Sequence, residues 1–118
     1  MKNPLHLSLK SELVPVLTLL ICYLASIYFY VHFPEMVPTH WNARGEIDGW
    51  APKTFGAFFF PILNTVIYLI LLGVPFIDPK KERYEQFMKT YHIIKASIVI
   101  FLSGIYLYTG FIGIKKSR

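Results

Sequence analysis

Three long apolar runs, separated by short polar segments, account for most of the chain. They cover residues 13–33, 53–77 and 92–114. A helix of about 20 apolar residues crosses the hydrocarbon core of a bilayer, and each run reaches that length. The pattern therefore predicts an all-α integral membrane protein, with three transmembrane helices in a single membrane domain that spans residues 1–118.

The two segments between the runs predict different structures. Residues 34–52 are polar, with Pro34 and Pro38 placed to end the first helix and glycines suited to turns. We expect a structured loop there, with a short hairpin-like excursion. Residues 78–92 begin with an Asp-Pro step and carry apolar side chains at three- and four-residue spacing. That spacing predicts an amphipathic helix that lies on the membrane surface as a connector.

Composition supports a membrane protein and argues against a nucleic-acid-binding one. The chain is 54% hydrophobic and only 16% charged, with a mean hydropathy of +0.46. A soluble fold of this size needs more polar surface, so lipid must cover part of the molecule. The net charge of +5 comes from basic residues that flank the apolar runs rather than from a basic stripe. The single cysteine, Cys22, excludes an intrachain disulfide.

The distribution of lysine and arginine predicts the orientation in the membrane. The N-terminal segment and the connector carry more of these residues than the loop and the C-terminus. Positive residues remain on the cytoplasmic side, so we expect a cytoplasmic N-terminus and an extracellular loop over residues 34–54.

Small and polar residues inside the runs predict where helices pack. Small side chains at four-residue spacing share one helix face and allow a neighbouring helix to approach closely. An amide at this depth is expected to bond across to another helix, and Lys95 lies near enough to an end for its stem to reach the headgroups. The predicted packing residues are Thr18, Cys22, Ser26, Asn64, Ser97 and Gly104.

The loop holds the chemically versatile side chains, but they match no catalytic or metal-binding pattern. His40, Glu46 and Asp48 are possible ligands, yet their spacing fits no established zinc signature. No nucleophile, phosphate-binding loop or cofactor motif accompanies them, so we expect no enzyme, no metal and no cofactor. In a purely structural interpretation, Asn42 and Asp48 cap turns, Glu46 pairs with Arg44 or Lys53, and Trp41 and Trp50 anchor the loop at the membrane interface.

The loop also resembles the signature of a known family. The run Pro38-Thr39-His40-Trp41-Asn42-Ala43-Arg44-Gly45-Glu46-Ile47-Asp48-Gly49-Trp50, followed by Lys53, is similar to the domain of unknown function that begins the SdpI-type bacterial immunity proteins. A second motif fits the same family through Pro75, Asp78 and Pro79, with Tyr84, Phe87 and Tyr91 downstream. The resemblance spans roughly residues 33–91.

The resemblance implies a multi-pass protein of the prokaryotic plasma membrane. SdpI-type proteins are longer, protect their host from a secreted killing peptide, and hold a cognate repressor at the membrane. We therefore expect a non-enzymatic immunity or sensing protein that binds a protein or peptide partner at the outer surface. The loop residues expected to bind or to shape the loop are Pro38, His40, Trp41, Asn42, Gly45, Glu46, Asp48, Gly49 and Trp50.

Three other functions remain open at this point. The chain has the composition of a small accessory subunit that packs against a larger membrane complex through its small-residue faces. It is also compatible with a transporter or channel-like oligomer in which Asn64 faces the interior. The last alternative is a metal-dependent membrane enzyme that uses His40, Glu46 and Asp48.

Overall fold

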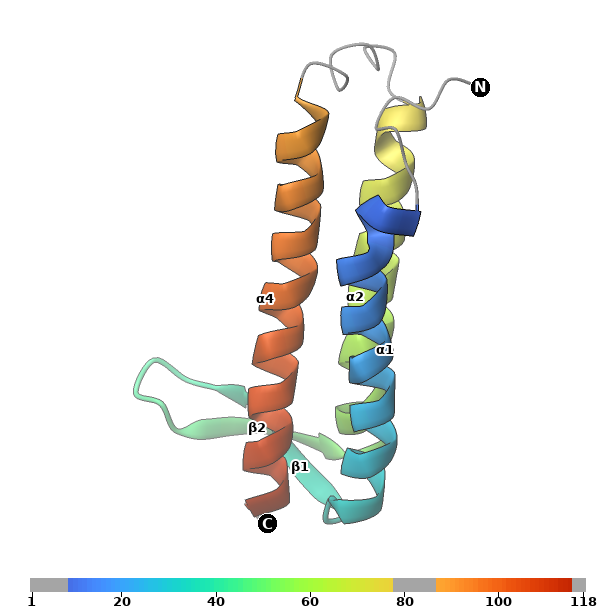
Figure 1. The fold of residues 1–118 in the computed structure, drawn as a ribbon. Coiled ribbons are helices and arrows are strands. Elements are labelled where there is room, and N and C mark those ends of the chain that lie inside the picture. The colour runs from blue at the N-terminus through green and yellow to red at the C-terminus, as the bar shows by residue number, and fades with distance from the viewer. Residues whose placement is uncertain (1–8, 78–86, 116–118) are drawn as a thin grey trace.

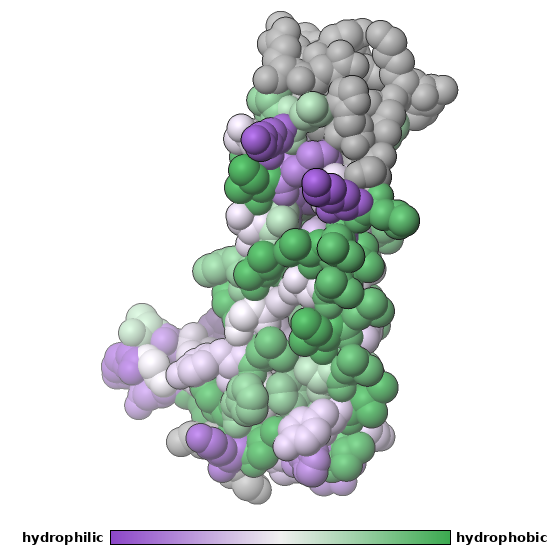
Figure 2. All heavy atoms as spheres, in the orientation of Figure 1, coloured by the Kyte–Doolittle hydropathy of each residue, from purple (hydrophilic) through white to green (hydrophobic). Residues whose placement is uncertain are grey.

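The computed structural model describes residues 9–77 and 87–115 as three long helices and one β-hairpin. The elements are α1 (Leu9–His32), β1 (Met36–Trp41), β2 (Ile47–Pro52), α2 (Lys53–Ile77) and α4 (Met88–Lys115). The helices lie side by side, and the hairpin projects from the bundle near the end where α1 and α4 finish (Figure 1). Each helix is long and apolar enough to cross a membrane. Hydrophobic residues cover the middle of the molecule on the face shown in Figure 2, and hydrophilic residues gather on the hairpin.

The three predicted helices are confirmed, but the first and third begin earlier than predicted and the loop contains two strands. The first helix begins at residue 9 rather than 13, and the third begins at residue 88 rather than 92. Because the 34–52 loop pairs into two strands, the all-α class is wrong in that respect. Residues 88–92 of the predicted surface connector belong to α4. Its remainder, together with Asp78 and Pro79, lies outside the described residues except for Phe87, which forms a bend.

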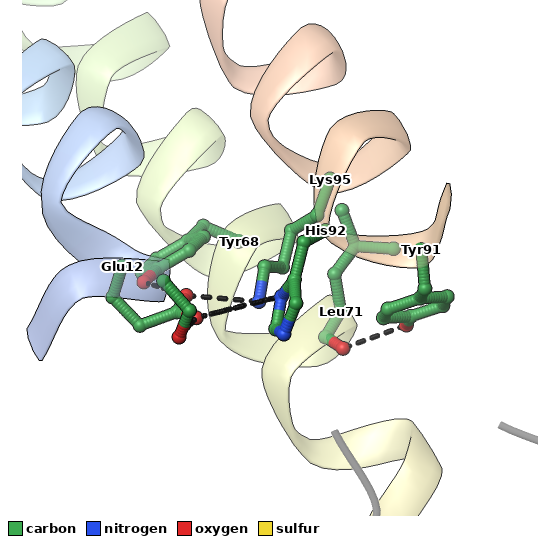
Figure 3. A network of polar contacts seen from close by, with 7 residues as sticks. Glu12, Tyr68, Leu71, Tyr91, His92 and Lys95 are labelled. Carbon is green, nitrogen blue, oxygen red and sulfur yellow. Dashed lines mark hydrogen bonds and ion pairs between the residues drawn. The ribbon is translucent and has the colours of Figure 1, made fainter. Parts of the chain in front are cut away.

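Two prolines inside α2 each remove a helical hydrogen bond, and two tyrosines of α4 replace them. A proline has no N–H, so it leaves the carbonyl four residues earlier without its helical donor. Pro61 does this to Ala57, whose carbonyl oxygen accepts from the Tyr106 hydroxyl at 2.6 Å. Pro75 does it to Leu71, whose carbonyl accepts from the Tyr91 hydroxyl at 2.7 Å (Figure 3). Within a membrane-spanning bundle such carbonyls need a protein partner, and these tyrosines fix α4 against α2.

Polar side chains also join the middle of the helices. Asn64 is 3% exposed and donates from Nδ2 to Ser103 Oγ at 3.0 Å and to the carbonyl of Val99 at 3.3 Å, as expected of an amide at this depth. Cys22 and Ser26 are buried, and Ser26 Oγ lies 3.0 Å from the Tyr106 hydroxyl.

The other predicted packing residues do not lie between the helices of this chain. Thr18 is only partly buried and bonds to the carbonyl of Val14 in its own helix. Ser97 is exposed, and a Cβ at Gly104 would meet nothing within 4 Å. The close contacts of α4 are instead at Gly110 and Gly113, which accommodate the rings of Phe29 in α1 and of Phe33 directly after it.

A charged network joins the three helices at the opposite end of the bundle from the hairpin. Lys95 is 1% exposed, and its Nζ lies 2.9 Å from both carboxylate oxygens of Glu12. Tyr68 donates to the same carboxylate at 2.6 Å, and His92 Nδ1 lies 3.1 Å from Lys95 Nζ. Figure 3 shows these side chains converging from α1, α2 and α4. The expectation that Lys95 reaches the headgroups is therefore wrong, because a carboxylate from another helix lies within its reach.

The Tyr106 hydroxyl replaces the helical hydrogen bond that Pro61 removes. The effects on stability of substitutions at Tyr106 and Pro61 should therefore depend on each other. Tyr106→Phe should lower the free energy of unfolding by about 1–3 kcal/mol, since the Ala57 carbonyl loses its donor. Unfolding by SDS in mixed micelles, followed by far-UV circular dichroism, measures the change. Tyr108→Phe is the matched control, because Tyr108 is 68% exposed on the same helix. In a Pro61→Ala background the restored N–H satisfies Ala57, so Tyr106→Phe should cost less. If Tyr106→Phe lowers the free energy of unfolding equally with Pro61 and with Pro61→Ala, the tyrosine hydroxyl does not take the place of the missing backbone N–H.

The buried ion pair predicts that single and double substitutions are not additive. Glu12→Gln leaves the Lys95 ammonium buried without a counter-charge, so we expect a loss of about 3–5 kcal/mol in the same unfolding measurement. Glu12→Gln combined with Lys95→Met removes both charges and should be more stable than Glu12→Gln alone. Lys89→Met, at an exposed lysine of the same helix, serves as the control. If Lys95→Met is as harmless as Lys89→Met, the pair does not hold the bundle together.

Candidate functional site: the β-hairpin

The hairpin is an irregular antiparallel pair of strands. Met36 pairs with Pro52 and Trp41 with Ile47, while the register shifts on both sides of His40. Such bulges strengthen the local twist and redirect side chains. Pro38 tolerates its missing donor because a two-stranded ribbon consists only of edge strands. The bulges place His40 opposite Gly49 rather than opposite a residue with a side chain.

Asn42 organises the turn at the hairpin end. Its Oδ1 accepts from the backbone N–H groups of Arg44 at 2.9 Å and Glu46 at 3.0 Å. Its own backbone N–H donates to the Glu46 carbonyl at 2.9 Å, and its carbonyl accepts from Gly45 at 3.0 Å. Gly45 has a φ of 79°, a left-handed conformation that glycine adopts without a Cβ clash. The predicted turn-capping role of Asn42 is confirmed, and the turn holds Arg44 and Glu46 in fixed backbone positions.

Charged side chains pair across and along the hairpin. His40 Nδ1 lies 2.5 Å from Asp48 Oδ1, and Arg44 Nε lies 3.1 Å from Glu46 Oε1. Asp48 therefore bonds to a side chain on the other strand instead of capping a turn. A Cβ at Gly49 would lie 2.9 Å from the His40 Cβ, so the glycine provides the space for this pair. Glu46 pairs with Arg44 as predicted, while Lys53 lies over the Tyr30 ring at 4.9 Å.

The base of the hairpin packs tightly onto the helices. Val37 is 1% exposed, and a Cβ at Gly56 would lie 2.4 Å from its Cγ2. The backbone N–H of Lys53 donates to the carbonyl of Glu35 at 3.0 Å, which closes the ribbon where α2 begins. Phe33, the residue after α1, packs on Gly113 of α4. The hairpin is thus packed on α2 and α4 at its base, while its turn extends away from the bundle (Figure 1).

The far half of the hairpin presents mixed charge to its surroundings. The side chains of Arg44, His40 and Glu46 are 82%, 72% and 63% exposed, and that of Asp48 is 41% exposed. We call these four residues the hairpin surface. Trp41 and Trp50 are only partly exposed, with Trp41 close to α4 residues. Trp41 therefore lies between the hairpin surface and α4.

The structure separates the candidate metal ligands. His40 and Asp48 bind each other, whereas Glu46 bonds to Asn42 and Arg44 at the turn. Within residues 9–77 and 87–115, no group of three His, Cys, Asp or Glu side chains has an arrangement suited to a metal ion. The alternative of a metal-dependent enzyme built on His40, Glu46 and Asp48 thus lacks a common site in the described part of the chain.

Sequence reasoning found the hairpin but missed the residues that fix it to the bundle. Val37 and Gly56 make the close contact at its base, Gly110 and Gly113 accommodate the rings of Phe29 and Phe33, and the sequence pattern indicates none of these contacts. A glycine near an end of an apolar run does not by itself predict close packing, because the sequence of the run does not show which side chain the glycine faces. Pro75, the described residue of the second motif, is buried inside α2 near the charged network, far along the helix from the hairpin.

Comparison with known proteins places a named domain over this site. A family model described as a domain of unknown function (DUF1648) matches residues 17–65, so a DUF1648 domain is found there. The match covers most of α1, the whole hairpin and the first half of α2, and it ends before the second motif. No curated protein and no solved structure matches the chain. The three apolar helices together with this domain indicate a multi-pass membrane protein.

The contact between Val37 and Gly56 predicts a glycine-specific effect on the hairpin. Gly56→Ala should move the hairpin base, because the new Cβ would lie 2.4 Å from Val37 Cγ2. We expect a changed emission maximum of Trp41 and Trp50 and a loss of about 1–3 kcal/mol in SDS unfolding. Gly73→Ala is the control on the same helix, since a Cβ there meets nothing within 4 Å. Equal behaviour of the two variants contradicts close packing at Gly56.

Proposed function

We propose that this chain is a non-enzymatic membrane protein that binds a protein or peptide partner through the hairpin surface. The observation that carries the proposal is the combination of a rigid frame with exposed paired charges. Asn42 closes the turn with backbone hydrogen bonds, and His40, Arg44, Glu46 and Asp48 project from it. The ribbon holds these side chains in fixed positions, although they contribute little to the stability of the bundle.

Preorganisation makes such a surface effective in binding. Ion pairs this exposed contribute at most about 1 kcal/mol to stability, so folding alone does not explain them. A partner that supplies complementary charges finds both signs already placed, and it orders few side chains on binding. Arginine and tryptophan are also frequent anchors of interfaces. Arg44 of the hairpin surface and Trp41, which lies beside it against α4, are residues of these types.

The resemblance to SdpI-type proteins suggests the kind of partner and its location. We propose a secreted peptide as the partner, in an immunity or sensing role at the plasma membrane. The excess of basic residues in the N-terminal segment and the 78–92 connector supports a cytoplasmic N-terminus, which leaves the hairpin at the outer surface. A peptide that arrives from outside then meets the hairpin before it reaches the bilayer core.

The proposal predicts resistance that depends on the hairpin surface. Sensitive bacteria that express the full chain should survive the killing peptide that SdpI-type proteins resist. His40→Ala and Asp48→Ala should remove survival, and loss of an anchor should weaken peptide binding by about 30-fold if it behaves as an interface hot spot. Peptide binding to the purified chain in nanodiscs provides the affinity. Lys10→Ala, at an exposed residue at the other end of the bundle, is the control.

Survival that is unchanged in the two hairpin variants, at equal protein levels, contradicts binding by this surface. The orientation is tested separately with an impermeant maleimide on intact cells. Ala43→Cys should be labelled and Lys89→Cys protected, while the native Cys22 is 1% exposed and gives little background. The reverse labelling pattern places the hairpin in the cytoplasm and rules out contact with a peptide from outside.

A further inference from the structure

A cavity of about 450 Å³ lies between α2, α4 and β1. Val37 and Trp41 line it beside the hairpin, and Leu63, Asn64 and Leu102 line it deeper in the bundle. On α4 its lining runs from Leu102 to Gly110, a separation of eight positions that corresponds to about 12 Å of helix. Its volume falls in the range of pockets that hold small molecules, roughly 300–1,000 Å³. Most of its lining is hydrocarbon, so it suits an apolar body about 12 Å long.

One buried polar atom beside this cavity has no partner. Asn64 Oδ1 is the single buried side-chain oxygen or nitrogen, among the described residues, that makes no hydrogen bond. Its orientation is determined by its neighbours, because the Val99 carbonyl can only accept and so requires the amide nitrogen on that side. A buried acceptor without a donor costs free energy, and such an atom in a cavity wall points to a ligand that supplies the donor.

The surroundings of Asn64 favour a donor attached to an apolar molecule over a lone water. A buried water typically makes about three hydrogen bonds. The cavity-lining side chains next to Asn64 along α2, Leu63 and Ile67, and Leu102 on α4, offer none. The hydroxyl groups of Tyr106 and Thr109, which also line the cavity, already donate to the carbonyls of Ala57 and Tyr106. A hydroxyl group on a hydrocarbon chain needs only the one acceptor, since its chain occupies the remaining volume.

The cavity is also accessible from the side of the bundle. Two of its lining residues, Leu63 and Ile105, are 41% and 48% exposed on the apolar surfaces of α2 and α4. A molecule dissolved in the bilayer can therefore enter between these helices without passing through water. The hairpin strand β1 closes the other end of the cavity through Val37, Pro38 and Thr39.

We propose that this cavity binds a small apolar molecule from the bilayer that carries one hydroxyl group, with the hydroxyl donating to Asn64 Oδ1. The chain of the ligand extends from Asn64 towards the hairpin and contacts Trp41. His40 belongs both to the hairpin surface and to the cavity lining, whereas Arg44, Glu46 and Asp48 do not line the cavity. The proposal does not depend on peptide binding.

The test uses two probes that differ only in the hydroxyl group. The full chain, in nanodiscs of phosphatidylethanolamine and phosphatidylglycerol, is titrated with 10-bromodecan-1-ol and with 1-bromodecane. Bromine quenches indole fluorescence on contact, and Trp41 lines the cavity. We expect saturable quenching by both probes. The alcohol should reach half-saturation at a concentration about two- to tenfold lower than the bromoalkane, which is the difference in affinity that one hydrogen bond provides. Asn64→Leu should abolish that difference while circular dichroism remains unchanged.

A second pair of variants keeps Asn64 intact and fills the cavity instead. Ile105→Phe should raise the half-saturating concentration of both probes several-fold. Ile100→Phe is the matched control, because Ile100 is 49% exposed on the same helix but does not line the cavity. Quenching that rises linearly without saturation overturns the proposal, as does equal half-saturation by the two probes in the native chain. Identical behaviour of the Ile105 and Ile100 variants overturns it too.

Discussion

The absence of water inside an apolar bundle is the constraint on which this structure depends. Pro61 and Pro75 leave the carbonyls of Ala57 and Leu71 without helical donors, and only side chains can satisfy them there. Tyr106 and Tyr91 do so from α4. Since Ala57 follows directly after the glycine that contacts Val37, the same bond that satisfies a carbonyl also determines where α4 lies relative to the hairpin. The placement of the candidate site thus follows from a backbone requirement in the helices.

Polar contacts recur at three levels along the bundle and join different helices at each. Near the hairpin, Tyr106 connects Ser26 of α1 with Ala57 of α2. In the middle, Asn64 bonds to α4, and at the far end Glu12 and Lys95 meet. Hydrocarbon side chains alone distinguish poorly between helix faces when lipid is equally apolar, so contacts of this kind specify register. The hairpin differs from the bundle in this respect, since its own polar bonds are local in sequence.

The sequence is a good guide to what is local and a poor guide to what is distant. Run lengths predicted three helices, and the turn chemistry of Asn42 and Gly45 predicted the excursion, because these depend on neighbouring residues. The small residues Ser97 and Gly104 share a helix face, but periodicity alone does not determine whether that face lies inside the bundle. The partner of Lys95 is 83 positions away. One distant signal was available: the two prolines of α2 and the two tyrosines of α4 have nearly equal spacing, which suits an antiparallel pair.

The ion pair between Glu12 and Lys95 also has a consequence for biosynthesis. Ribosomes make α1 before α4, so the carboxylate enters the membrane well before the ammonium that neutralises it. A lysine on a single helix opposes insertion by the translocon, by roughly 2.5–3.5 kcal/mol at a helix centre. An α1 that is already in place reduces this cost for α4 by offering the counter-ion. The opposite charges on α1 and α4 thereby favour their association within one polypeptide during its synthesis.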